Sequence, residues 1–185
     1  YVTIERRDGI AVVRFDRKKN LNAFDEKLVT ELTFAARSFH DDLKTQAVVL
    51  AGAPNAFSAG FDLKATDGWP SATDDLERRH RAYGGVRLCK AWEAMPQITI
   101  AAMEKLSVGA GCAIALACDW RVLARNAFVS LPEIALGIPL TWGTVPRLVN
   151  LLGPAKEMQA QYLPQIRDKA QNLDMGQVMS LVRGA

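Results

Sequence analysis

Two segments of the chain contain residue types that could hold a strongly polarised oxygen through backbone N–H groups. One is Phe57-Ser58-Ala59-Gly60-Phe61-Asp62-Leu63-Lys64, and the other begins at Gly109-Ala110-Gly111 and continues as an alanine-rich run. Glycine permits turns in which successive N–H groups point outward, and the first N–H groups of a helix have no partner within the helix. Two such donors directed at one carbonyl oxygen would stabilise negative charge that develops there during a reaction. A purely structural alternative is that the small residues only allow close packing.

Few other side chains are candidates for catalysis or metal binding. The cysteines are Cys89, Cys112 and Cys118, with no Cys-x-x-Cys pair, so we expect buried apolar side chains and no metal site. His40 and His80 are the two histidines, too few for a three-histidine zinc site. A serine hydrolase that uses Ser58 is disfavoured because the Gly-x-Ser-x-Gly pattern is absent.

Composition limits the class of protein. The 185 residues are 49% apolar and 23% charged, which is typical of one globular domain. The net charge is +3, and the basic residues are spread along the chain, so we expect no nucleic-acid partner. No apolar run reaches the roughly 18 residues that a bilayer span needs, and Tyr1 opens directly into a strand-like pattern. We therefore expect no membrane segment, no signal peptide and a cytoplasmic location.

The order of the predicted elements indicates an α/β fold. Strands over 2–7 and 10–16 flank Asp8-Gly9, a strong hairpin signal, and Asp25 is placed to cap a helix. The short apolar runs at 47–51 and 98–103 predict strands buried on both faces. A further strand is expected near 120–125, and helices near 74–94, 110–118 and 144–152. The loop from Asp67 to Asp75 is expected to be mobile, with a solvated connector favoured over an active-site lid.

Several segments, in this order and spacing, resemble the crotonase, or enoyl-CoA hydratase/isomerase, superfamily. They are Asn20-Leu21-Asn22-Ala23, residues 57–64, Gly109-Ala110-Gly111-Cys112, residues 115–119, and Leu131-Pro132-Glu133 with the run to Pro139. The resemblance covers roughly residues 1–157 and implies a crotonase-like (ClpP/crotonase) spiral of ββα units. Residues 158–185 are charged and amide-rich and are expected to form a separate helical segment on the surface or facing a partner. The C-terminal region usual in the family has no evident counterpart there.

The resemblance also implies the chemistry. The family holds an acyl-CoA thioester with its carbonyl oxygen between two backbone N–H groups, which correspond here to Phe61 and Ala110. It thereby stabilises an enolate-like intermediate. Glu133 corresponds to the acid or base that exchanges a proton with the acyl chain, and its apolar sequence neighbours are expected to bury it and raise its pKa.

Binding residues follow from the same resemblance. Lys64 corresponds to the lysine near the CoA phosphates, and Asn22, Ala23 and Ala59 to the region around the CoA entrance. Thr141 and Trp142 are candidate walls of the acyl pocket, although Trp142 fits a core aromatic equally well. No cofactor is expected beyond the coenzyme A of the substrate, and the resemblance implies a homotrimer or a dimer of trimers.

Two departures from the family pattern leave the reaction open. Two-carboxylate hydratases carry a second glutamate at the position of Ala113, and a methyl group cannot activate water. Members that use a later aspartate place it at Thr141, so their chemistry is disfavoured. Single-carboxylate enoyl-CoA isomerases and hydroxycinnamoyl-CoA hydratase-lyases keep the glutamate that corresponds to Glu133. The alternatives are thus an isomerase or hydratase, a hydratase-lyase, and a catalytically weak acyl-CoA-binding protein.

Overall fold

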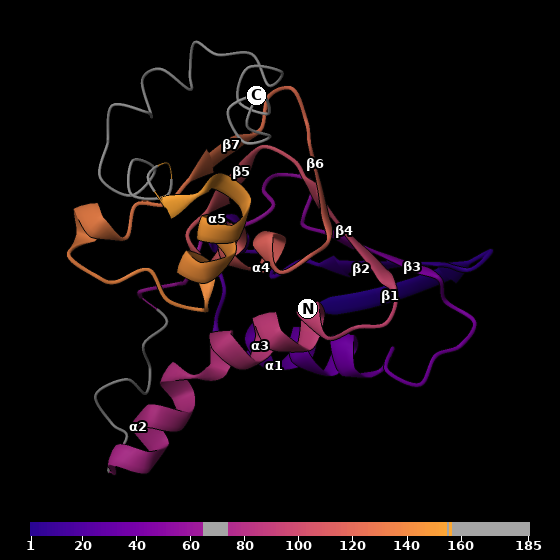
Figure 1. The fold of residues 1–185 in the computed structure, drawn as a ribbon, viewed down its shortest axis with the longest axis horizontal. Helices are drawn as coiled ribbons and strands as arrows, with labels where there is room; N and C mark the ends of the chain where they lie inside the picture. The colour runs from indigo at the N-terminus through magenta and orange to yellow at the C-terminus, as the bar shows by residue number, and fades with distance from the viewer. Residues whose placement is uncertain (65–73, 155, 157–185) are drawn as a thin grey trace.

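The computed structural model describes residues 1–64, 74–154 and 156 (Figure 1). The chain opens with the predicted hairpin, in which β1 (Val2–Arg7) and β2 (Ile10–Phe15) are antiparallel. Asp8 and Gly9 between them have φ angles of 50° and 78°. A two-residue turn with positive φ at both positions matches the twist of the flanking strands, so the Asp-Gly signal predicted the hairpin correctly.

Helix α1 (Glu26–Arg37) begins where the sequence predicted. The side chain of Asp25 accepts a hydrogen bond of 2.8 Å from the backbone N–H of Leu28, which satisfies one of the unpaired donors at the helix start. The helix buries its apolar face, and the short η1 turn (Asn20–Asn22) precedes it.

The main sheet has five strands in the order β1-β2-β3-β4-β6. Strands β3 (Ala47–Ala51), β4 (Ile98–Met103) and β6 (Trp120–Leu123) follow β2 in parallel pairings, as the α/β pattern predicted. Burial on both faces was a wrong prediction for β4, where burial alternates because α1 and α3 cover one face and leave Ile98 56% exposed on the other. The residues of β3 are buried or half-buried.

The expected helix near 74–94 is two helices. Asp74 caps α2 (Asp75–Ala82), and α3 (Gly84–Glu93) starts after a break at Tyr83. Asp74 and Asp75 are therefore part of a helix start and not of the loop predicted over 67–75, whose other residues lie outside the described part of the chain. Helix α3 lies beside α1, whereas α2 projects away from the body and buries no residue (Figure 1).

A second, two-stranded parallel sheet carries the segments of chemical interest. It pairs β5 (Leu106–Val108) with β7 (Phe128–Ser130), a strand that the sequence did not indicate. Helix α4 (Ala110–Leu116) follows β5, and the η2 turn (Ile134–Leu136) and α5 (Thr144–Leu152) follow β7. The predicted C-terminal segment 158–185 lies outside the described residues. Within the described ranges, no helix has the length and apolar character needed to cross a membrane.

Candidate active site

The segment around Gly60 is held between β5 and the loop before α1. On one side, Ser58 pairs with β5, since its N–H donates to Leu106 O and its carbonyl accepts from Val108 N, both at 2.9 Å. On the other side, Phe24 N donates to Gly60 O at 2.7 Å, and Asp62 N donates to Phe24 O at 2.8 Å. In this parallel bridge the N–H of Phe61 points away from Phe24.

This arrangement brings together the two glycine turns that the sequence singled out. Gly60 has a φ of 94°, and a methyl group in place of its hydrogen would lie 3.8 Å from Ala110 N. A methyl group on Gly109 would lie 4.0 Å from Gly60 Cα. Ala110 is the first residue of α4 and does not have a positive φ, so an alanine fits this position without backbone strain. Within the described ranges, nothing accepts a hydrogen bond from the Ala110 N–H.

Glu133, in the segment that follows β7, lies next to these turns. Ser130 pairs with Val108, and its carbonyl accepts a hydrogen bond of 2.9 Å from Gly109 N. The chain then turns so that a methyl group on Gly109 would lie 2.7 Å from Glu133 Oε1. The side chain of Glu133 therefore lies directly against the turn that carries Ala110.

Burial controls the protonation of Glu133. Its Oε2 atom is buried, and no described residue forms a hydrogen bond with it. Loss of water around the carboxylate raises its pKa, although a hydrogen bond from its own backbone N–H acts in the opposite direction. Of the apolar neighbours expected to bury it, Ala135 and Leu136 are exposed, whereas Leu131, Pro132 and Ile134 are half-buried. The Gly109 turn also lies against the carboxylate.

Comparison with known proteins identifies the family. The model of the family described as enoyl-CoA hydratase/isomerase matches residues 5–183. The chain belongs to this family. The match confirms the predicted acyl-CoA enzyme family, and it extends past residue 157, where the resemblance was expected to end.

Individual relatives of the enoyl-CoA hydratase/isomerase family agree with this assignment. A crotonyl-CoA hydratase of Syntrophomonas wolfei is 28% identical over 183 residues, which cover 98% of this chain and 69% of that protein. A short-chain-enoyl-CoA hydratase of Clostridium acetobutylicum is 30% identical over 182 residues, with 98% and 68% covered. The structure of Pseudomonas aeruginosa AtuE superposes with a TM-score of 0.84 at 25% identity, covering 98% and 67%. The crotonase-like fold is thus confirmed, and about a third of each relative lies outside the match.

The other predicted site residues differ in their burial and in their contacts. Asn22 and Ala23 are buried, and the Asn22 side chain donates to Phe57 O at 2.8 Å, so it supports the segment before Gly60. Ala59 is half-buried, and its N–H donates to Leu21 O. Lys64 and Thr141 are exposed, whereas Trp142 is half-buried and packs against the ring of Phe61.

A buried ionic cluster beneath this segment was missed by the sequence analysis. Arg17 Nη1 lies 2.6 Å from Asp62 Oδ2, Arg17 Nε lies 2.7 Å from Asp25 Oδ2, and Asn20 also donates to Asp62. Burial acts to raise the pKa of Asp62, but hydrogen bonds from Asn20 and Arg17 outweigh it and lower that pKa to about 2. The Asp62 carboxylate therefore stays ionised, and its ion pair with Arg17 holds Asp62, the residue after Phe61, in place. Asp62, which is the one charged residue in 57–63, was the available signal.

Replacement of Arg17 by methionine is expected to destabilise the fold strongly. The variant would leave the buried Asp62 carboxylate without its cation, which costs about 3–5 kcal/mol of the free energy of unfolding. Urea unfolding measures this loss. The matched control is Arg7→Met, because Arg7 and Asp8 form an ion pair with side chains 91% and 84% exposed, and no measurable loss is expected. Equal losses in the two variants would contradict a supporting role for the cluster.

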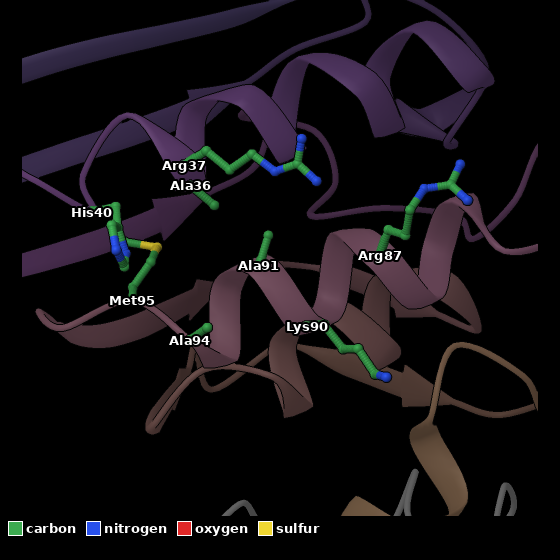
Figure 2. Close-up of a pocket in the computed structure, with 8 residues that line it drawn as sticks. All are labelled: Ala36, Arg37, His40, Arg87, Lys90, Ala91, Ala94 and Met95. Carbon is green, nitrogen blue, oxygen red and sulfur yellow. The ribbon is translucent and has the colours of Figure 1, made fainter.

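A hollow of about 370 Å³ between α1 and α3 does not belong to this site. Figure 2 shows Ala36 of α1 facing Ala91 of α3 across it, with His40 beside Met95 at one end. Its lining residues include neither glycine turn and none of the predicted site residues. The hollow therefore gives no support for an acyl pocket at that place.

Proposed function

We propose that the chain acts on an enoyl-CoA-type thioester, with the carbonyl oxygen between the N–H groups of Phe61 and Ala110. Glu133 transfers the proton. The most direct support is that the Gly60 turn, the Gly109 turn and the Glu133 carboxylate lie close together. A methyl group on Gly109 would lie 2.7 Å from Glu133 Oε1 and 4.0 Å from Gly60 Cα. Donors aimed at the oxygen where charge develops, beside a buried base, suit the formation of an enolate.

In the proposed reaction, the Glu133 carboxylate removes a proton from C2 of a 3-enoyl thioester. The electron pair of the C–H bond moves into the thioester, and the resulting dienolate oxygen is stabilised by the two N–H groups. Glu133 then delivers a proton to C4, so that the double bond moves from C3–C4 to C2–C3. One carboxylate therefore performs both proton transfers, and no water is consumed.

The position of Ala113 favours isomerisation over hydration. Ala113 lies in the first turns of α4, it is only 2% exposed, and its methyl group packs in the core. The site as described therefore has the carboxylate of Glu133 but no second one at the position where two-carboxylate hydratases hold theirs. A hydroxycinnamoyl-CoA hydratase-lyase-like activity also needs one such glutamate, and it is the second candidate.

The substrate-binding roles are part of the same proposal. Lys64, exposed directly after Asp62, would attract the CoA phosphates, with Asn22, Ala23 and Ala59 near the entrance and Thr141 at the acyl wall. We also propose a homotrimer or a dimer of trimers.

Hydrogen exchange at C2 of bound thioesters tests the proposal. The protein is incubated in D2O with acyl-CoA, and deuterium at C2 is followed by NMR, alongside turnover of 2-enoyl-, 3-enoyl- and hydroxycinnamoyl-CoA. We expect exchange at C2 of saturated acyl-CoA and of 3-enoyl-CoA, whose C2 protons are acidified by the thioester, and net conversion of 3-enoyl-CoA. A protein that only binds acyl-CoA would show no exchange, and this result would overturn the proposal.

Replacing Gly109 by alanine is expected to disable the site locally. The added methyl group would lie 2.7 Å from Glu133 Oε1, and the φ of 49° strains any residue with a Cβ. The carboxylate must move, and displacement of a reacting group by about 1 Å can lower kcat about 100-fold. Steady-state kinetics measures the effect. The matched control is Gly137→Ala, where φ is also positive but a methyl group would have no neighbour within 4 Å, and a kcat close to wild type is expected. Equal losses of kcat would show that backbone strain, rather than the Glu133 contact, is responsible.

A further inference from the structure

Trp142 has a backbone conformation that tryptophan rarely adopts. Its φ is 59°, and the next residue, Gly143, has a φ of 72°. The left-handed conformation costs free energy for a residue with a bulky side chain. Such strain persists where the surrounding structure determines the conformation, and it often marks a functional position.

Two contacts hold Trp142 in this conformation. Arg147 Nη1 donates hydrogen bonds of 2.9 Å to both Trp142 O and Gly143 O, and Arg147 Nη2 lies 2.7 Å from Glu93 Oε2 of α3. The indole ring in turn lies directly on the backbone of Gly85 in α3. A Cβ atom at Gly85 would lie 1.9 to 2.1 Å from the indole ring atoms, a distance that no packing can accept.

The indole ring of Trp142 contacts both Phe24 and Phe61, the two residues of the parallel bridge. It makes edge-to-face contacts with Phe24 at 5.5 Å and with Phe61 at 6.3 Å between ring centroids. Phe24 holds the backbone of Gly60 and Asp62 on either side of Phe61. A shift of the indole ring would therefore displace Phe24 and Phe61 together, and with Phe24 the hydrogen bond to Gly60 O that orients the peptide group of the Phe61 N–H.

We propose that Trp142, seated on Gly85, is a positioning residue that fixes the direction of the Phe61 N–H. The proposal rests on the proposed function, because it gives that N–H its role. It differs from a pocket wall, which would affect substrates according to the length of their acyl group. A positioning residue affects every thioester alike, including acetyl-CoA, which has no acyl carbon beyond C2 to reach a wall.

The test compares Gly85→Ala with Gly84→Ala, its neighbour in α3. A methyl group on Gly84 would meet Val29 Cγ1 at 3.5 Å, an ordinary contact, so the control adds the same group without touching the indole ring. We measure exchange at C2 of acetyl-CoA and of a longer acyl-CoA, the dissociation constants of both, and circular dichroism. Gly85→Ala is expected to slow exchange with both thioesters about 10-fold or more, with dissociation constants changed less than about 2-fold, and Gly84→Ala to exchange like wild type.

A second variant keeps the test decisive if Gly85→Ala does not fold. Trp142→Ala removes the ring and adds no atoms, so it should slow exchange with both thioesters to a similar extent. The ring atoms that a methyl group on Gly85 would meet are absent in this background, and the double variant should exchange as fast as Trp142→Ala alone. Equal rates in Gly85→Ala, Gly84→Ala and wild type, or a loss confined to the longer thioester, would overturn the positioning role. Absence of exchange in the wild type would instead overturn the proposed function.

Discussion

Replacement of Glu133 by glutamine is expected to lower kcat by about 10²–10⁴-fold, the usual contribution of a general acid–base group. Glutamine keeps the shape of the side chain but cannot accept the C2 proton. The dissociation constant for acyl-CoA should stay close to wild type, because the proposed donors to the thioester oxygen are backbone groups. Steady-state kinetics and calorimetric titration measure the two quantities.

The pH profile supplies the control for this variant. Burial raises the pKa of Glu133, and the base must be ionised to accept a proton. In the wild type, kcat/KM should therefore increase with pH through a value above the ordinary glutamate range, and the residual activity of Glu133→Gln should lack this step. Unchanged turnover in the variant would remove Glu133 from the mechanism.

Replacement of Ala110 by proline is expected to lower kcat by about 10²–10³-fold, as removal of one oxyanion donor does in other enzymes. Proline has no N–H, yet it is well suited to the first position of a helix, which Ala110 occupies in α4. The substitution therefore deletes the donor with little disturbance of the helix. Stopped-flow or steady-state assays with an enoyl-CoA measure the loss.

Ala110→Gly is the matched control, because it changes the side chain and keeps the N–H. Its kcat should remain near that of the wild type, and thermal unfolding should confirm that both variants are folded. If the proline and glycine variants retain equal activity, the Ala110 N–H is not a donor to the substrate.

The elements that follow from local sequence were predictable. Asp8-Gly9 determines the hairpin because both turn residues have positive φ, and Asp25 determines the start of α1 through its hydrogen bond to Leu28. The break at Tyr83 and strand β7 were not predictable in this way. Their stability depends on tertiary contacts, as in the pairing of β7 with β5, which local patterns do not contain.

The site was predictable only in its parts. Residue types indicated the two glycine turns, and the family pattern indicated Glu133. The contact between Gly109 and the Glu133 carboxylate, however, depends on the register of β5 and β7. The ion pair between Arg17 and Asp62 likewise joins residues 45 positions apart. No periodicity or spacing in the sequence reports such pairs, because they form where separate segments meet.

The most direct test of the proposed mechanism is the structure of the protein with a bound acyl-CoA. We expect the thioester oxygen about 2.7–3.1 Å from both Phe61 N and Ala110 N. We also expect the Glu133 carboxylate in contact with C2 of the acyl group. A thioester oxygen that contacts neither nitrogen, or a Glu133 side chain turned away from C2, would contradict it.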